Sequence, residues 1–340
     1  MHSVRDHKNI PIFIPHMGCP HQCVFCDQRT ISGHATFEEN QVKDEIEAAI
    51  ATLTDGAVAE IAYFGGSFTA IDRGLMVRLL DVAQGYVDAG RVRGIRFSTR
   101  PDAMGEDILD ILSHYTISAV ELGLQSLDDR VLSLCRRGHT AAQAEDACRR
   151  IVSRGYPLVG QMMLGLPEST PNSERETAER ICALGVCAAR VYPTVVFEGT
   201  ALAVMMKKGT YCPLSNEQAA ERAAAVLDIF ERQGVDILRV GLCASEGLNS
   251  ARAVGGANHP ALGEMAYGAL FRMHMMQAIE ASPMIGRGET ATFTVPRGKR
   301  SQAIGQRRSN AIWLAEHYGI RRLIIKESDQ LTGTSVLLSE

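Results

Sequence analysis

The stretch IPIFIPHMGCPHQCVFCD, residues 10–27, puts an apolar run of strand length directly before a loop with three cysteines. Five more apolar runs of that length follow, and amphipathic helical patterns separate them. This alternation is typical of repeated βα units, whose strands lie parallel in one sheet. We therefore expect six strands, at residues 10–14, 60–64, 95–98, 118–122, 158–164 and 189–195.

Capping boxes mark where several helices begin. In a capping box, a Ser or Thr and a Glu or Gln three residues later each accept a hydrogen bond from the other's backbone N–H. Three such pairs are present: Thr36 with Glu39, Thr140 with Gln143, and Ser215 with Gln218. The first pair would open a helix with an apolar face formed by Val42, Ile46, Ile50 and Leu53.

Six βα units predict an open barrel. Right-handed crossovers curl a parallel sheet toward a barrel, and six units are too few to close it. The predicted fold class is therefore α/β, a partial (β/α)6 barrel of the TIM type. Functional residues should lie at the carboxyl ends of its strands.

After residue 195 the pattern changes. A helix is expected at 216–233, then a strand at 236–240 and a glycine-rich loop at 241–263. The last fifty residues predict a small α/β extension, with a strand at 292–295, a helix at 302–318 and a strand at 323–326. The expected domains are a core barrel with its extension at 1–245, a loop and connecting helix at 246–285, and a basic module at 286–340.

Composition excludes several classes of protein. With 340 residues, 46% of them apolar, and 35 basic against 39 acidic side chains, the chain is neither disordered nor collagen-like. Its longest apolar run, residues 181–189 between two arginines, is shorter than the ~18 residues of a membrane helix. Residues 1–8 contain no apolar secretory segment, so we expect a cytoplasmic protein with reduced thiols. Nine cysteines then favour metal or redox chemistry.

Cys19, Cys23 and Cys26 follow the first predicted strand and precede the first helix, which places them at the mouth of the barrel. Three thiolates on one loop can hold three irons of a [4Fe–4S] cluster and leave the fourth iron open. A structural zinc site needs four protein ligands, and no second CxxC pair is available here. Chance clustering in a core is the alternative.

The pattern CxxxCxΦC, with Phe25 before the last cysteine, resembles the radical S-adenosylmethionine superfamily. The resemblance implies a cluster whose open iron chelates the amino and carboxylate groups of S-adenosylmethionine. One electron then breaks the C5′–S bond, and the 5′-deoxyadenosyl radical abstracts hydrogen from a substrate. Phe25 is expected beside the cofactor.

Gly65, Gly66 and Ser67 end the second predicted strand. Glycines let a ligand approach the backbone, whose carbonyls can accept from an ammonium group. The triplet is similar to the superfamily's Gly-Gly-Glu position, with Ser67 in place of the acid. A simple turn is the alternative.

Three further segments, FSTRPD at 97–102, ELGLQS at 121–126 and MLGLP at 163–167, resemble the branch of the Elongator catalytic subunit and oxygen-independent coproporphyrinogen oxidase. In that oxidase, polar side chains at four positions surround S-adenosylmethionine; the matching residues here are Ser98, Gln125, Arg137 and Gln161. Gln125 and Arg137 keep its residue types, whereas Ser98 and Gln161 replace a Glu and an Asp. A capped strand end and a solvated charge are the alternatives for Gln125 and Arg137. The chain ends too soon for the Elongator acetyltransferase domain, so acetyl chemistry is not expected.

The other six cysteines lack close spacing, and we expect core thiols rather than a second cluster: Cys135, Cys148, Cys182, Cys187, Cys212 and Cys243. Cys243 lies in a Gly-flanked loop after a predicted strand and is a candidate catalytic residue. His259 is a second candidate, for proton transfer, although a His before a Pro in a turn is usually structural. Tyr267 faces the same choice.

The C-terminal extension is basic. Its eight cations between residues 296 and 326 face one acid, Glu316. The segment AIGQRRSNAIWL, residues 303–314, resembles a KH module, whose GxxG loop clamps a nucleotide backbone. Here Arg308 replaces the second glycine, and Arg307 beside it adds a cation suited to phosphate. A solvated basic surface is the alternative.

These observations predict a radical S-adenosylmethionine enzyme that carries a [4Fe–4S] cluster, with RNA or tRNA as its first substrate hypothesis and a flipped base in the barrel. A small molecule or peptide substrate is the second hypothesis. A non-catalytic iron–sulfur regulator that binds RNA is the third. The expected partners are a reductant such as flavodoxin or ferredoxin and RNA, with no membrane.

Overall fold

A computed structural model describes residues 7–19, 23–27, 36–54, 57–242, 252–282 and 290–339. The helices of this described part include none with both the length and the apolar character needed to cross a bilayer. The predicted boundaries at 245 and 285 fall within residues 243–251 and 283–289, which lie outside the description.

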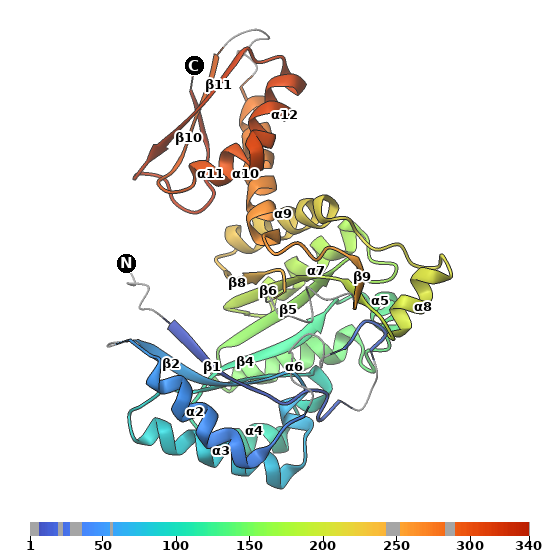
Figure 1. Ribbon diagram of the computed structural model, residues 1–340, viewed down its shortest axis with the longest axis vertical. Helices are drawn as coiled ribbons and strands as arrows, with labels where there is room; N and C mark the ends of the chain where they lie inside the picture. Colours follow the sequence, from blue (N-terminus) through green and yellow to red (C-terminus); the bar gives the residue numbers. More distant parts are fainter. Residues whose placement is uncertain are drawn as a thin grey trace.

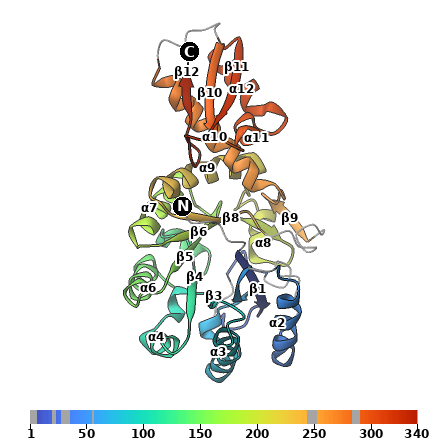
Figure 2. The same ribbon diagram turned by 90° about the vertical axis from the view of Figure 1, so that its left-hand side faces the viewer.

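A curled sheet of seven parallel strands forms the main body (Figure 1, Figure 2). In spatial order its strands are β1 (His7–Phe13), β2 (Val58–Phe64), β3 (Ile95–Thr99), β4 (Ile117–Gln125), β5 (Leu158–Leu164), β6 (Ala188–Pro193) and β8 (Asp236–Val240). The edge strands β1 and β8 do not pair with each other, so the barrel stays open. The predicted partial barrel is confirmed, and β8 adds a seventh strand to it.

The helices that follow the strands pack on the outer side of the curled sheet, as Figure 2 shows. They are α2 (Val42–Ala51), α3 (Arg73–Asp88), α4 (Glu106–Leu112), α5 (Asp129–Leu134), α6 (Ala141–Ser153), α7 (Pro171–Ala183) and α9 (Asn216–Arg232). Their apolar faces and the outward side chains of the strands form one continuous core.

Two of the three predicted capping boxes are present, those of Thr140 and Ser215. The box predicted at Thr36 is wrong, because a short 3₁₀ turn, η1 (Glu39–Gln41), comes between Thr36 and α2. The residues that cap η1 and α2 use no side-chain hydrogen bond. The apolar face of α2 is as predicted, since Val42 and Ile46 are buried in the core.

Inward-facing residues in the middle of the sheet form a buried charged layer. Glu121 of β4 is 1% exposed and accepts two hydrogen bonds from Arg190 of β6, at 2.8 and 2.9 Å. Arg96 of β3 lies between Glu60 of β2, at 3.2 Å, and Glu121, at 3.6 Å. Gln161 of β5 completes the layer by donating to Glu121 at 2.9 Å. Five neighbouring strands are thereby cross-linked inside the barrel.

The chain leaves the sheet after β6, at Thr194. Its N–H and Oγ1 both donate to the carbonyl of Leu164, at 2.9 and 2.8 Å. Residue 195 was predicted to continue the sixth strand, but it begins β7 (Val195–Phe197), which pairs antiparallel with β9 (Ala253–Gly256). The helix α8 (Ala201–Lys207) follows β7. The predicted loop 241–263 therefore contains a strand, and its last residues begin the next helix.

That helix, α10 (Leu262–Glu280), leads to a C-terminal module at the top of Figure 1. The module contains β10 (Thr290–Pro296), α11 (Arg300–Ile304), η4 (Gln306–Arg308), α12 (Ser309–Tyr318), β11 (Arg322–Ser328) and β12 (Leu337–Ser339). Its sheet has the order β11-β10-β12. The single helix predicted at 302–318 is wrong, because Gly305, Arg307 and Arg308 have φ angles of 78°, 50° and 64° and break it.

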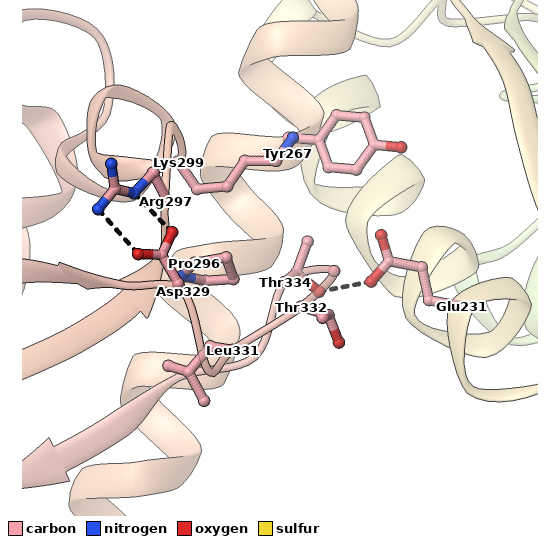
Figure 3. A pocket seen from close by; sticks show the side chains of 10 residues that line it. Glu231, Tyr267, Pro296, Arg297, Lys299, Asp329, Leu331, Thr332 and Thr334 are labelled. Atoms are coloured by element: carbon pink, nitrogen blue, oxygen red, sulfur yellow. Dashed lines mark hydrogen bonds and ion pairs between the residues drawn. The ribbon is translucent and has the colours of Figure 1, made fainter. Parts of the chain in front are cut away.

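A cavity of about 390 Å³ lies where the module meets the barrel (Figure 3). The Lys299 ammonium lies 5.6 Å from the centre of the Tyr267 ring on α10. Thr334 of the module donates to Glu231 of α9 at 2.5 Å. Tyr267 therefore helps to join the two parts of the chain.

A buried ion pair links α7 and α9. Glu174 is 3% exposed, and both its oxygens accept from Arg222, at 2.6 Å each. One oxygen also accepts from the Gly165 N–H at 2.7 Å. Burial raises the pKa of the Glu174 carboxyl even with Arg222 beside it. The arginine is needed to keep this carboxylate charged.

We predict that Arg222→Met lowers the free energy of unfolding by about 3–5 kcal/mol, because it leaves a buried carboxylate unpaired. Arg130→Met removes an exposed partner of Glu168 and should cost less than about 1 kcal/mol. Anaerobic urea unfolding of both variants checks this. Equal losses would show that the Glu174–Arg222 pair contributes no more than a surface pair.

Candidate functional site

The three clustered cysteines lie beyond the carboxyl end of β1, as the sequence predicts. Cys23 is 8% exposed, and Cys19 and Cys26 are half-buried. Two backbone hydrogen bonds of Val24, the residue after Cys23, anchor the loop. The Val24 N–H donates to the carbonyl of Cys135 at 3.2 Å, and the Val24 carbonyl accepts from the Leu202 N–H at 2.8 Å. The thiols are thus held against α5 and α8.

Two buried guanidinium groups point at the sulfur of Cys23. Arg137 Nη1 lies 3.3 Å from Sγ, and Arg100 Nη1 lies 3.8 Å from it. Arg137 also donates from Nη2 to the carbonyl of Gly123 at 2.5 Å. Arg100 and Arg137 are 4% and 5% exposed, so neither cation is solvated by bulk water. Buried cations require anionic partners.

The excess positive charge of the side chains around the cysteine loop favours thiolates or another anion. Burial raises the pKa of the Cys19 thiol, while the guanidinium groups of Arg100 and Arg137 oppose that rise. Asp102 is the carboxylate that pairs with Arg100, at 2.9 Å, and it balances one of the two cations. The second positive charge suits a negatively charged occupant between the cysteines.

The glycines that follow β2 let the cysteine loop pass close by. A Cβ on Gly66 would lie 2.4 Å from the carbonyl oxygen of Met17, and a Cβ on Gly18 would lie 2.3 Å from the carbonyl oxygen of Ser67. Gly65 has a φ of 96°, which suits glycine. The two backbone segments are therefore in direct contact.

Ser67 is fully buried behind this contact. Its Oγ lies 3.1 Å from Thr99 Oγ1 and accepts from the N–H of Arg100 at 3.2 Å. Phe68 stacks on Tyr63 with ring centres 4.6 Å apart. Ser67 thus links the end of β2 to the backbone of Arg100, whose guanidinium group lies beside Cys23.

Gly66→Ala should lower the free energy of unfolding by about 1–3 kcal/mol and displace the cysteine loop, because its new Cβ meets backbone rather than a movable side chain. The matched control is Gly85→Ala in α3, where, apart from the adjacent residues and the helix's own backbone, no described atom lies within 4 Å of the new Cβ. That control should gain about 0.5–1 kcal/mol. Calorimetry and the iron content after anaerobic reconstitution measure the two effects; a stable, fully loaded Gly66→Ala protein would contradict the steric account.

The other predicted cofactor residues occupy different levels of the barrel. Gln125 ends β4 with a φ of 67°, and its buried Oε1 has no hydrogen-bond partner among the described residues. Ser98 lies on β3 opposite Glu121 in the strand register, so it borders the charged layer. Gln161 lies within that layer, bonded to Glu121. Phe25 packs half-buried against the cluster of Val24 and its neighbours. Their roles toward a cofactor stay predictions.

His139 was not identified from the sequence. It is 6% exposed, and its Nδ1 lies 3.3 Å from the carbonyl of Thr140. Burial, together with the Arg137 charge, lowers the pKa of His139 to about 4. The imidazole is therefore neutral beside the two guanidinium groups. His139 directly precedes the N-cap of α6, so it belongs to no amphipathic pattern from which its burial could be predicted.

This burial predicts a pH dependence of stability. The unfolded chain takes up a proton on His139 as the pH falls below about 6.5, whereas the folded chain does so only near pH 4. Stability from this group is therefore lost as the pH falls through that window. His139→Gln should reduce the loss between pH 6.5 and 4 by on the order of 2–3 kcal/mol in urea unfolding. The exposed His114→Gln should follow the parent protein; identical profiles for all three would refute the effect.

The donor set fits an iron–sulfur cluster with a polar ligand beside it. Among the described residues, no three His, Cys, Asp or Glu side chains meet closely enough to hold a single metal ion. In a cluster each thiolate binds a different iron, so its ligands need not converge on one point. Three buried polar atoms beside the loop also lack partners within the described chain: Gln125 Oε1, Arg137 Nε and His139 Nε2. An occupant with both donors and acceptors would satisfy them.

The remaining cysteines differ in how deeply they are buried. Cys135 and Cys148 are buried, as predicted for core thiols, and burial raises the pKa of each to about 12. The prediction is wrong for Cys187 and Cys212, which are exposed: Cys187 lies directly before β6, and Cys212 lies in the segment after α8. Cys182 is half-buried. Cys243 lies outside the described residues.

His259 is exposed and shapes the start of α10. Its Nδ1 accepts a hydrogen bond from the Ala261 N–H at 3.1 Å, and its own N–H donates to Asn216 at 3.2 Å. These bonds are those of a turn residue. A proton-transfer role for His259 stays a prediction.

Arg307 and Arg308 form the turn between α11 and α12. Both are exposed, and within the described residues neither side chain makes a hydrogen bond or ion pair; the Arg308 N–H donates to the carbonyl of Gly305 at 3.0 Å. Gln306 of the same turn lines a groove of about 170 Å³ together with Glu217 and Glu221 from the first turns of α9. The two guanidinium groups are free to bind an anion.

Two family models match most of the chain. The model described as the radical SAM superfamily matches residues 13–181, and the one described as the Radical_SAM C-terminal domain matches residues 186–284. An uncharacterized protein of Methanocaldococcus jannaschii is 29% identical over 62% of this chain and 67% of its own length.

A tRNA uridine(34) acetyltransferase of Dehalococcoides mccartyi is 25% identical over 58% of this chain and 51% of its own length, so the chain spans about half of that relative. Among solved structures, the archaeal Methanocaldococcus infernus Elp3 with an N-terminal deletion superposes with a TM-score of 0.62 at 20% identity. The match covers 84% of this chain and 66% of that one. It supports the fold.

Proposed function

The chain belongs to the radical S-adenosylmethionine superfamily, and we propose that it is a cytoplasmic enzyme whose substrate is RNA of the tRNA class. A [4Fe–4S] cluster and S-adenosylmethionine are its cofactors. When bound, the cluster supplies the electron that cleaves S-adenosylmethionine to a 5′-deoxyadenosyl radical. A one-electron reductant such as flavodoxin or ferredoxin would provide that electron.

The residues of the barrel mouth divide the work of binding. Cys19, Cys23 and Cys26 would hold the cluster. Arg137 would pair with the carboxylate of S-adenosylmethionine, since its buried Nε has no partner among the residues that the structure describes. Gln125 Oε1 offers an acceptor for the ammonium group of the same ligand. Both groups come from the carboxyl end of β4 and the segment after it, where a barrel enzyme binds its ligands.

The observation that carries the RNA proposal is the turn Gly305–Arg308. The order β10, α11, turn, α12 and β11 matches the strand–helix–turn–helix–strand order of a KH-like module. Left-handed backbone at Arg307 and Arg308 projects from the turn two guanidinium groups that have no ion-pair partner in the described part of the chain. Guanidinium groups bind phosphate through paired N–H donors.

The turn also faces the same side of the molecule as the barrel mouth. All strands of the barrel run in one direction, and α9 leads back to the start of β8. The first turns of α9 therefore lie near the carboxyl ends of the strands. Gln306 lines one groove with Glu217 and Glu221 of those first turns. An RNA held at the turn could extend toward the cysteine loop.

The tRNA class is favoured by relatives whose names record tRNA modification, such as the acetyltransferase of Dehalococcoides mccartyi. A small molecule or peptide would leave the basic turn without a role in turnover. In an RNA-binding regulator, the acceptor Gln125 Oε1 and the donor Arg137 Nε would bind no ligand. Both alternatives make different experimental predictions from an RNA-modifying enzyme.

We predict that the double variant Arg307→Ala, Arg308→Ala weakens tRNA binding and flattens the slope of log K against log salt by about 1–2, because fewer counterions are released. The matched control is Arg73→Ala with Arg78→Ala, two paired arginines on the outer helix α3. Fluorescence anisotropy from 50 to 300 mM salt measures both. Equal slopes for the two double variants would show that the turn does not contact phosphate.

The reaction itself is tested by anaerobic incubation of the reduced protein with total tRNA, followed by nucleoside mass spectrometry. A new nucleoside together with 5′-deoxyadenosine is expected, and Cys23→Ala should yield neither. Turnover of S-adenosylmethionine without any change in tRNA would favour a small substrate. Tight RNA binding that persists without 5′-deoxyadenosine formation would favour a regulator.

A further inference from the structure

Arg100 differs from Arg137 in how completely its donors are used. Its Nε and Nη2 donate to the two oxygens of Asp102, at 2.9 and 3.0 Å. Nη2 also donates to the backbone carbonyl of Arg137, and Nη1 points at Cys23 Sγ. Within the described residues, four of the five N–H donors of this guanidinium are therefore used, whereas Arg137 uses two.

The backbone around Arg100 is equally fixed. Its N–H donates to Ser67 Oγ, and Ser67 follows the glycines that contact the cysteine loop. Residues 101–103 then form a 3₁₀ turn that begins with Pro101. The side chain is 4% exposed, so its cation lies in a region of low dielectric next to the sulfur.

We propose that Arg100 is a positioning residue that raises the reduction potential of the cluster bound by Cys19, Cys23 and Cys26. Reduction adds one negative charge to the cluster and its thiolates. A buried cation that donates to a cluster sulfur stabilises the reduced state more than the oxidised one. Asp102 acts in the opposite direction, because its carboxylate offsets part of the positive charge of Arg100.

This arrangement gives two variants with effects of opposite sign. Arg100→Met removes the cation and leaves Asp102 unbalanced, so the cluster should become harder to reduce. Asp102→Asn keeps the cation and removes the carboxylate, so the cluster should become easier to reduce. A purely structural role for this pair predicts no such reversal.

The inference rests on the cluster site of the proposed function and not on RNA as the substrate. The test is an anaerobic potentiometric titration of the reconstituted protein, monitored by electron paramagnetic resonance and without S-adenosylmethionine. For Arg100→Met we expect the ratio of reduced to oxidised cluster at a fixed potential to fall about tenfold, which is 59 mV for one electron. Asp102→Asn should shift the midpoint upward, and Arg100→Lys should restore part of the parent value.

Two controls separate the possible failures. Arg130→Met removes an exposed cation that pairs with Glu168, and its midpoint should equal the parent's. Iron and sulfide content confirms that each variant carries a full cluster. If Arg100→Met cannot hold the cluster, the upward shift of Asp102→Asn still decides the matter. Unchanged midpoints in fully loaded Asp102→Asn and Arg100→Met proteins would overturn the role of Arg100, whereas a parent protein without any cluster would overturn the cluster site itself.

Discussion

The contact on which the site depends is the passage of one backbone segment against another at Gly18 and Gly66. No side chain fits at either position, since a Cβ would lie 2.3 to 2.4 Å from a carbonyl oxygen of the opposite segment. This contact fixes the cysteine loop to the end of β2. Through Ser67 it also fixes Arg100, so the geometry around Cys23 follows from two missing side chains.

Charge is distributed over two separate buried layers. The middle of the barrel is closed by Glu121, Arg190 and their neighbours, whose charges compensate one another. Nearer the carboxyl ends, Arg100 and Arg137 face the Cys23 thiol, and one carboxylate, Asp102, pairs with Arg100. The positive and negative charges of the first layer cancel, so it can be purely structural. The second layer has one more cation than carboxylate, so it needs an anionic occupant. The barrel therefore confines its reactive chemistry to one end.

Sequence patterns predicted the parallel sheet well, because mostly apolar runs of strand length alternate with amphipathic helical patterns. They also located the three cysteines, whose spacing is local. They could not locate Arg100 or His139 as site residues, because the burial of both depends on contacts between distant segments. The helix predicted at 302–318 ran through the break at Arg307 and Arg308, since arginine carries no signal for left-handed backbone, although the KH resemblance placed a loop at residues 305–308.

The contacts between the C-terminal module and the barrel connect the basic turn of the module to the chemistry at the cysteine loop. The module meets the barrel at both ends of α9: Gln306 shares a groove with the first turns of that helix, and Thr334 bonds to Glu231 near its last turn. His274 of α10 adds a third tie, with its ring nitrogens 2.9 Å from Asp228 and from the carbonyl of Thr334. Because the ties lie at both ends of one helix, rotation of the module about that helix is resisted at each of them. The distance from the turn at Arg307 to the cysteine loop is thus set by rigid elements, which is the condition for a bound RNA to reach the barrel mouth in one register.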